Sequence, residues 1–171
     1  MGSDLRHPRG SLARGVRVKS VEELTALFRS RGLKVTPQRQ VIFRVLGSTP
    51  HHPTAETVHT AVRSELPTIS LRTVYQSLND LSAMGELSAL DLGTGSTRFD
   101  PTLEPHHHLV CVACGTIEDL HYDFPGVVLP DAAEGFEVNA TEIVFRGRCA
   151  SCAAHDDAAA APFEGSALSE L

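Results

Sequence analysis

The chain of 171 residues has no hydrophobic run that approaches the about 18 residues needed to cross a bilayer. Its first twenty residues carry several arginines and a lysine, but the apolar segment of a secretory signal does not follow them. We therefore expect a cytoplasmic protein with no membrane partner.

Cysteine is also scarce, and the few cysteines are informative. They form two pairs, Cys111–Cys114 and Cys149–Cys152, with two residues inside each pair. Two such knuckles can fold around one tetrahedral Zn²⁺ ion, which accepts four thiolates at about 2.3 Å. The alternatives are four unpaired thiols or two disulfides, and disulfides do not fit a reducing cytoplasm. The spacing predicts a closed structural zinc site that leaves no coordination position open for chemistry.

Basic residues are nearly absent from the second half of the chain. Residues 1–103 contain 13 Lys and Arg against 9 Asp and Glu, a balance of +4. Residues 104–171 contain 2 against 12, a balance of −10. No internal repeat is visible, so this asymmetry indicates two small modules with different partners. The basic module suits a polyanion better than the acidic module does.

Helix signals dominate the first module, after a segment at residues 1–19 that we expect to be a flexible basic arm. Ser20 and Glu23 form a capping box. Thr36 followed by proline is a second start signal, and Pro53 with Thr54 opens a third helix. Ser70 caps a fourth helix, and apolar residues recur at three- and four-residue spacing along it until Gly85.

A hairpin follows these helices. Two predicted strands, at residues 86–92 and 96–100, flank a glycine-rich turn. Short helices followed by a hairpin describe a winged helix, whose helix from Ser70 would enter the major groove of DNA. Its side chains suit base edges and phosphates. The expected DNA contacts are Arg39, Arg72, Thr73, Tyr75 and Gln76, and Arg44 and Arg98 could add phosphate contacts.

Short apolar runs replace long helices beyond residue 104. They predict strands at residues 108–112, 116–120 and 142–146, with a short helix within 124–135. Residues 154–171 are acidic and rich in alanine, and we expect them to form a disordered tail.

A second set of potential metal ligands lies near the cysteines. His106 and His108 would project from one face of a strand, and His107 from the other. Carboxylates and one further histidine join them from elsewhere in the chain. The complete candidate set is His52, Asp100, His106, His108 and Asp119. A mixed nitrogen and oxygen site of this kind should prefer Fe²⁺, Mn²⁺ or Zn²⁺ to a soft ion.

These motifs resemble the ferric uptake regulator (Fur) family. The matching stretches run in the family's order and cover roughly residues 20–153. They are residues 31–39 (RGLKVTPQR), 52–55 (HPTA), 70–75 (SLRTVY), 106–108 (HHH), 111–115 (CVACG) and 147–152 (GRCASC). Together they are highly specific.

The resemblance implies an α+β homodimeric repressor of palindromic operator DNA. It places an N-terminal winged-helix DNA-binding domain at residues 20–101, and a small α/β dimerisation domain at residues 102–153. It assigns the four cysteines to structural zinc. It also assigns the five-residue His and Asp set to a regulatory site for Fe²⁺ or Mn²⁺ that joins the two domains.

Within the family the chain looks most like the peroxide-responsive, PerR-type branch, which includes catalase-regulating members. Asp119 stands where the iron-sensing branch commonly has glutamate. This likeness implies that peroxide oxidises His52 and His106 when Fe²⁺ is bound, and that DNA is then released. An iron- or zinc-availability sensor is the alternative within the family. A metalloenzyme is the alternative from another class, but no separate nucleophile or general base accompanies the cluster in the sequence, so we expect no enzyme.

Overall fold

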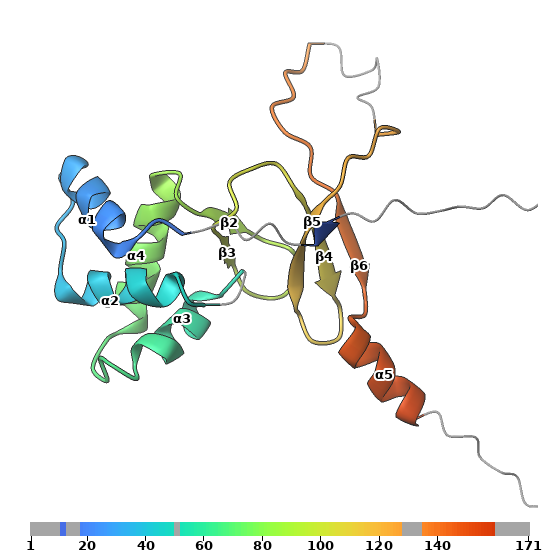
Figure 1. Ribbon diagram of the computed structural model, residues 1–171, viewed down its shortest axis with the longest axis horizontal. Coiled ribbons are helices and arrows are strands. Elements are labelled where there is room, and N and C mark those ends of the chain that lie inside the picture. Colours follow the sequence, from blue (N-terminus) through green and yellow to red (C-terminus); the bar gives the residue numbers. More distant parts are fainter. Residues whose placement is uncertain (1–10, 13–17, 50–51, 128–134, 160–171) are drawn as a thin grey trace, which may run out of the picture.

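The structure is a computed structural model that describes residues 11–12, 18–49, 52–127 and 135–159. Figure 1 shows a group of helices at one end of the molecule and a β-sheet at the other, with a short strand pair between them. We call the helices with that strand pair the helical unit, and the larger sheet with the last helix the sheet unit.

The helical unit begins with α1 (Val21–Ser30), α2 (Pro37–Leu46), α3 (Ala55–Val62) and α4 (Leu71–Ala83). Each helix starts where its sequence predicts. The Ser20 hydroxyl accepts the amide of Glu23, whose carboxylate accepts the amide of Ser20, so the capping box is complete. The hydroxyl oxygens of Thr36 and Ser70 cap α2 and α4 by accepting the amides of Arg39 and Thr73.

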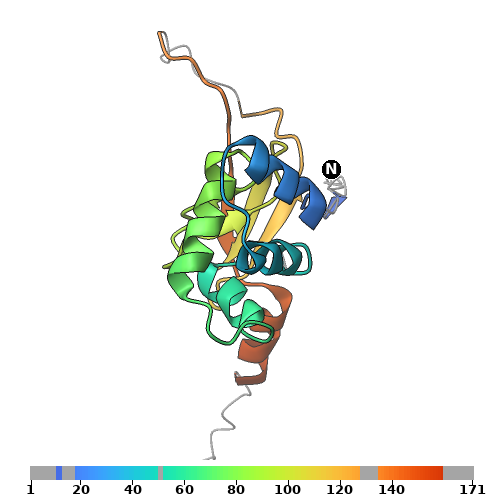
Figure 2. The same cartoon turned by 90° about the vertical axis from the view of Figure 1, so that its left-hand side faces the viewer.

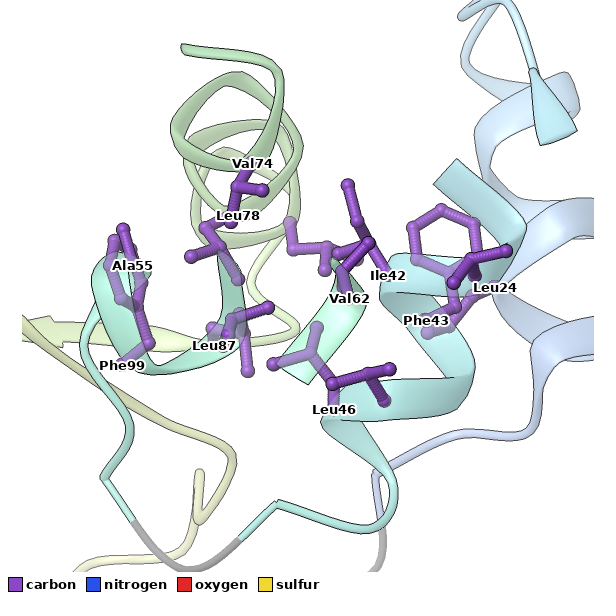
Figure 3. Packing of buried hydrophobic residues seen from close by; sticks show 14 of the residues in the cluster. Leu24, Ile42, Phe43, Leu46, Ala55, Val62, Val74, Leu78, Leu87 and Phe99 are labelled. Carbon is purple, nitrogen blue, oxygen red and sulfur yellow. The ribbon is translucent and has the colours of Figure 1, made fainter. Parts of the chain in front are cut away.

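The core of this unit lies between α1, α2, α3 and α4 (Figure 3). Phe28 of α1 packs on Phe43 of α2, with ring centroids 4.9 Å apart. Leu87, just before the strand pair, and Phe99, within it, reach into the same cluster and are almost completely buried. The apolar burial that folds the helices therefore also attaches the hairpin to them.

The hairpin consists of β2 (Ser88–Leu90) and β3 (Arg98–Asp100), which pair antiparallel with Ala89 opposite Phe99. Both strands are shorter than predicted, because the glycine-rich segment between them forms a wide loop. Helices followed by this wing confirm the winged-helix prediction.

The sheet unit contains β1 (Ser11–Leu12), β4 (His107–Cys111), β5 (Ile117–His121) and β6 (Val144–Gly147), in the order β1-β5-β4-β6. Strands β4 and β5 are antiparallel, whereas β4 and β6 are parallel. Helix α5 (Ala150–Ala159) follows β6 and points away from the sheet. Viewed from the helical end in Figure 2, the sheet stands behind helices α1 to α4.

Three expectations from the sequence, for the two chain ends and one loop, differ from the structure or concern residues outside the described ranges. Residues 11–12 of the expected flexible arm form β1 on the edge of β5. Helix α5 runs to Ala159, so it occupies the start of the segment expected to be a disordered tail. The rest of that tail lies outside the described residues, as does most of the short helix expected within 124–135. None of the helices in the described ranges has the length and apolar character of a membrane span.

Candidate metal centres

The first candidate centre contains all four cysteines. Cys111 ends β4 and Cys114 lies in the turn after it, while Cys149 directly precedes α5 and Cys152 lies in its first turn. The parallel pairing of β4 with β6 sets Cys111 opposite Gly147, which brings the two sequence pairs together. Gly115 closes the first turn at a φ of +71°, a conformation that glycine adopts without strain.

The four sulfur atoms are spaced as ligands of one ion. They lie within 4.8 Å of one another, and all four cysteines are free thiols. The Sγ atoms of Cys114 and Cys149 are 3.8 Å apart. A tetrahedral Zn²⁺ ion with bonds of about 2.3 Å requires sulfur atoms about 3.8 Å apart. The donor set and its spacing therefore fit a structural zinc ion.

The pKa values of these thiols depend on the backbone amides and the other thiols beside them. The backbone amide of Cys149 donates to Sγ of Cys111 at 3.3 Å and, with the Cys114 amide, lowers the pKa of Cys111 to about 6. The neighbouring thiols of Cys149 and Cys114 raise the pKa of Cys152 to about 12. Because the neighbouring thiols oppose ionisation of Cys152, a divalent cation is needed to hold four adjacent thiolates.

The second candidate centre gathers its ligands from both units. His52 comes just before α3, and Asp100 ends β3 in the helical unit. His106 precedes β4, while His108 of β4 stands opposite Asp119 of β5 in the sheet. His52, Asp100 and His108 are at most 2% exposed. The structure thus brings together all five residues that the sequence nominated, at the junction of the two units.

The neighbouring His107 lies apart from this cluster, as the alternation of a strand predicts. Its Nδ1 atom accepts the backbone amide of Ile143 at 3.2 Å, and its ring contacts Phe124. His107 is therefore a natural internal control for chemistry at its two neighbours.

The ligand atoms of the second centre converge on one point. The Nε2 atom of His108 lies 3.0 Å from that of His106 and 3.1 Å from that of His52. Carboxylate oxygens close the cluster, with Asp119 3.0 Å from His52 and Asp100 3.1 Å from His106. Asp100 Oδ2 and Asp119 Oδ1 are buried without a hydrogen bond from the described residues. Two buried carboxylate oxygens that face three imidazole nitrogens at this spacing fit a divalent metal ion.

Burial and charge act in opposite directions on these groups. Burial lowers the pKa of His52, but Asp100 and Asp119 outweigh it and raise that pKa to about 9. Burial raises the pKa of Asp100, yet His108 and His52 hold it well below its ordinary range. The two carboxylates therefore favour a proton on His52. A metal ion must displace that proton, because only neutral imidazole is a ligand.

A surrounding layer of contacts orients the ligands, and sequence reasoning missed it. The Thr102 hydroxyl donates to Asp119 Oδ2 at 3.0 Å. The Nδ1 atom of His106 lies 2.8 Å from the carbonyl of Glu104, and that of His108 lies 2.7 Å from Glu142. The ring of His121 packs 5.5 Å from that of His106. Only Thr102 carried a local signal, because its amide also donates to Asp100 two residues before it.

The residues expected to contact DNA fall into two groups. Arg72 is exposed on the first turn of α4. Three others have partners inside the helical unit: the Thr73 hydroxyl pairs with that of Ser70, the Tyr75 hydroxyl donates to Glu56, and the Gln76 amide donates to Asp80.

Arg39 has a different position from the one expected. Its guanidinium forms an ion pair with Asp80 of α4, donates to the carbonyl of Lys34, and lies 4.9 Å from the centre of the Phe28 ring. The Arg39 side chain is 14% exposed. This arginine joins α2 to α4, and we no longer expect it to contact phosphate. Arg44 likewise pairs with Glu65.

Known proteins share this sequence pattern and this fold. Residues 30–146 match the ferric uptake regulator family. A peroxide-responsive repressor, PerR, of Staphylococcus epidermidis is 36% identical over 134 residues, which cover 77% of this chain and 89% of that protein. The ferric uptake regulator of Helicobacter pylori superposes with a TM-score of 0.63 at 21% identity, over 80% of this chain and 96% of that one. A zinc-bound manganese uptake regulator superposes with a TM-score of 0.58 at 26% identity, over 77% and 99% of the two chains.

Proposed function

Because the chain belongs to the ferric uptake regulator family, we propose that it is a metal-dependent transcriptional repressor that responds to peroxide. The observation that carries this proposal is the convergence of His52, Asp100, His106, His108 and Asp119 at the junction of a winged helix and a second unit. The similarity to a peroxide-responsive repressor over most of both chains supports the same assignment.

We assign the two centres to different ions. The four thiolates suit Zn²⁺, which has no redox chemistry of its own and holds the fold. The mixed set of imidazole and carboxylate ligands suits Fe²⁺ or Mn²⁺. Two buried carboxylate oxygens that face the imidazole nitrogens, and that accept no hydrogen bond within the described part of the chain, support occupancy of this second site by a cation.

Metal controls DNA binding through linkage. An ion bound by ligands from both units favours the arrangement in which those ligands meet. If that arrangement sets the two α4 helices of a dimer one turn of DNA apart, then metal raises operator affinity. A coupling free energy of about 1–3 kcal/mol changes that affinity by roughly 5–150-fold.

A homodimer on palindromic DNA is part of the proposal. Strand β6 is an outer strand of the sheet, and Phe145 on it is 42% exposed. Val112, in the turn after β4, is 67% exposed. Apolar side chains at a sheet edge suit contact with a second copy of the chain. A reducing cytoplasm suits the four free thiols.

Peroxide acts on the ligands themselves. Bound Fe²⁺ supplies the redox chemistry that activates peroxide, whereas Mn²⁺ does not. His52 and His106 are the residues that gain oxygen: one oxygen atom of a peroxide molecule is added to an imidazole carbon, and the other leaves as water. The modified ring is a weaker ligand, so the two units separate and the operator is released. The protein carries out no catalytic turnover.

The test compares the two metals on one operator. Zinc-loaded protein is filled anaerobically with Fe²⁺ or Mn²⁺, bound to a palindromic duplex, and treated with peroxide. The expected result is release of DNA by the Fe²⁺ form alone, with a mass increase of one oxygen in the His52 and His106 peptides. Retention of DNA by the Fe²⁺ form, with both histidines unmodified, would instead identify an iron- or zinc-availability sensor. A metalloenzyme would show no metal-dependent DNA binding.

A further inference from the structure

Arg98 of β3 joins both candidate metal centres through backbone carbonyl groups. Its Nη2 atom donates to the carbonyl of Gly115, in the turn that carries Cys114, at 2.9 Å. Its Nη1 atom donates to the carbonyl of His52 at 3.4 Å, and its Nε atom donates to the Thr94 hydroxyl. One planar guanidinium therefore contacts three parts of the chain. They are the loop between β2 and β3, which we call the wing loop, the backbone of His52 in the mixed histidine and aspartate site, and the turn that carries Cys114, which we call the cysteine turn.

A second arginine makes the reciprocal contact. Arg146 of β6 donates from Nη1 to the carbonyl of Leu92, in the wing loop, at 2.7 Å. Arg98 and Arg146 line one cavity, together with Gly93 and the turn that carries Cys114. Each unit thus sends one arginine to a backbone carbonyl of the other, on the side of the junction that faces the cysteines.

The contact of Arg98 with His52 differs from the contact of Arg146 with Leu92, because His52 has an unusual backbone conformation. Its φ is +56°, which makes it the sole non-glycine residue with a positive φ in the described part of the chain. A side-chain-bearing residue adopts this conformation only when its surroundings hold it there. The next peptide unit is held too, since the Phe99 amide donates to the carbonyl of Pro53 at 3.0 Å.

The position of the Gly115 carbonyl depends on how the cysteine turn is folded. The Gly115 amide donates to the carbonyl of Cys111 at 2.9 Å, which closes the loop between the two cysteines. A β-carbon at Gly115 would lie 3.3 Å from Nη2 of Arg98, so the guanidinium sits close against this backbone. The folded cysteine turn is therefore the anchor for the group that holds His52.

We propose that Arg98 is a positioning residue that holds His52 in its ligand conformation and couples the mixed metal site to the four-cysteine site. Arg146 joins the two units beside it but does not touch His52. This inference rests on the proposed function in one respect, namely that the mixed site binds a divalent ion.

The experiment measures the Mn²⁺ affinity of zinc-loaded, full-length protein by titration calorimetry for the parent, R98A, R98K and R146A. R29A is the matched control, because Arg29 is an exposed arginine of α1 and its loss changes the charge equally. Zinc content and thermal midpoint are recorded for every variant. Co²⁺ added to the same zinc-loaded proteins reports ligand geometry through its visible absorption bands.

We expect R98A to lower Mn²⁺ affinity about tenfold or more, the range found for residues that orient metal ligands. R98K should lower it as well, because one ammonium group cannot reproduce the planar fork that reaches two carbonyls. Both variants should retain zinc and change the Co²⁺ bands. R146A and R29A should stay within about threefold of the parent and keep its bands.

Two results overturn the inference. One is parent-like Mn²⁺ affinity in R98A and R98K. The other is an equal loss in R98A and R146A with unchanged Co²⁺ bands, which would show general loosening of the junction. Failure of the parent itself to bind Mn²⁺ would count against the proposed function, and the titration of the parent separates that case from the other two.

Discussion

The carboxylate of Glu142 lies 2.7 Å from Nδ1 of His108, on the side of the imidazole ring opposite the cluster. This contact fixes the ring plane and directs Nε2 of His108 toward the other ligands. Carboxylates in this position commonly orient a metal-bound histidine and increase its basicity. Glu142 comes from the segment before β6, 34 residues away in the sequence.

We predict that Glu142→Ala lowers the Mn²⁺ affinity of zinc-loaded protein by about tenfold, near the low end of the usual range, because the Glu142 side chain is 42% exposed. Glu142→Gln keeps an acceptor oxygen and should lose less. Titration calorimetry checks both. Glu118→Ala, on the exposed side of β5, is the control and should bind as the parent does. Equal affinity in Glu142→Ala and the parent would remove this orienting role.

The zinc prediction concerns Cys111, the buried member of the four-cysteine centre. Cys111→Ser leaves three thiolates and should lose zinc, since a hydroxyl is a poor ligand in place of a thiolate. The binding energy of structural zinc is folding energy, so the thermal midpoint should fall with the zinc content. Metal analysis and a melting curve measure the two effects. Ala113→Ser changes an exposed residue of the same turn and should keep both. A zinc-free variant of normal thermal stability would contradict the structural role.

Local signals predicted those parts of the structure that depend on local interactions. Ser20, Thr36 and Ser70 each start a helix because a hydroxyl satisfies an amide three residues later. The cysteine pairs and the alternation of His106 and His108 are equally local patterns. Both ligand sets, His52 included, could therefore be named from the sequence.

Tertiary contacts decided what the sequence could not predict. Arg39 and Arg98 were both expected to meet phosphate, but Arg39 lies against Asp80 and Arg98 against the carbonyls of His52 and Gly115. An arginine carries no local mark that distinguishes a phosphate contact from an internal one. Glu142 had no signal either, because its partner is distant in the sequence.

The ion pair between Arg39 and Asp80 predicts that Arg39 contributes to the stability of the fold. Arg39→Ala removes a largely buried pair and leaves Asp80 with its bond from Gln76. We expect the free energy of unfolding to fall by about 2 kcal/mol, the scale of a charged hydrogen bond in a partly buried site. Arg44→Ala is the matched control, because the exposed pair of Arg44 with Glu65 should contribute under about 1 kcal/mol. Urea unfolding followed through the helical signal measures both. Equal losses in the two variants would contradict the internal role.

The DNA prediction concerns α4. Arg72→Ala and Tyr75→Ala should each weaken operator binding by about 1–3 kcal/mol, the size of one good base contact. Zinc content should not change in either variant. Tyr75→Phe separates the ring from the hydroxyl, which donates to Glu56 in the free protein. Arg29→Ala, on α1, serves as the charge control. Fluorescence anisotropy at fixed salt gives the affinities, and parent-like binding by both alanine variants would exclude α4 as the recognition helix.

The peroxide prediction concerns Asp119, whose Oδ1 atom faces His52 and whose Oδ2 atom accepts the Thr102 hydroxyl. Asp119→Glu lengthens the side chain by one methylene, so it cannot keep both contacts in the same geometry. We expect the Fe²⁺ form of this variant to retain metal-dependent operator binding but to require more peroxide for release. Dose-response curves for the parent and the variant give the comparison.

Fragment mass spectra supply the internal control for this last experiment. His106 and His107 are neighbours in the chain, but only His106 belongs to the cluster, while His107 packs on Phe124. Oxidation directed by bound Fe²⁺ should therefore add oxygen to His106 and His52 and leave His107 unmodified. Equal oxidation of His106 and His107 would show that peroxide attacks without direction from the site. Unchanged peroxide sensitivity in Asp119→Glu would show that the length of this carboxylate does not set the response.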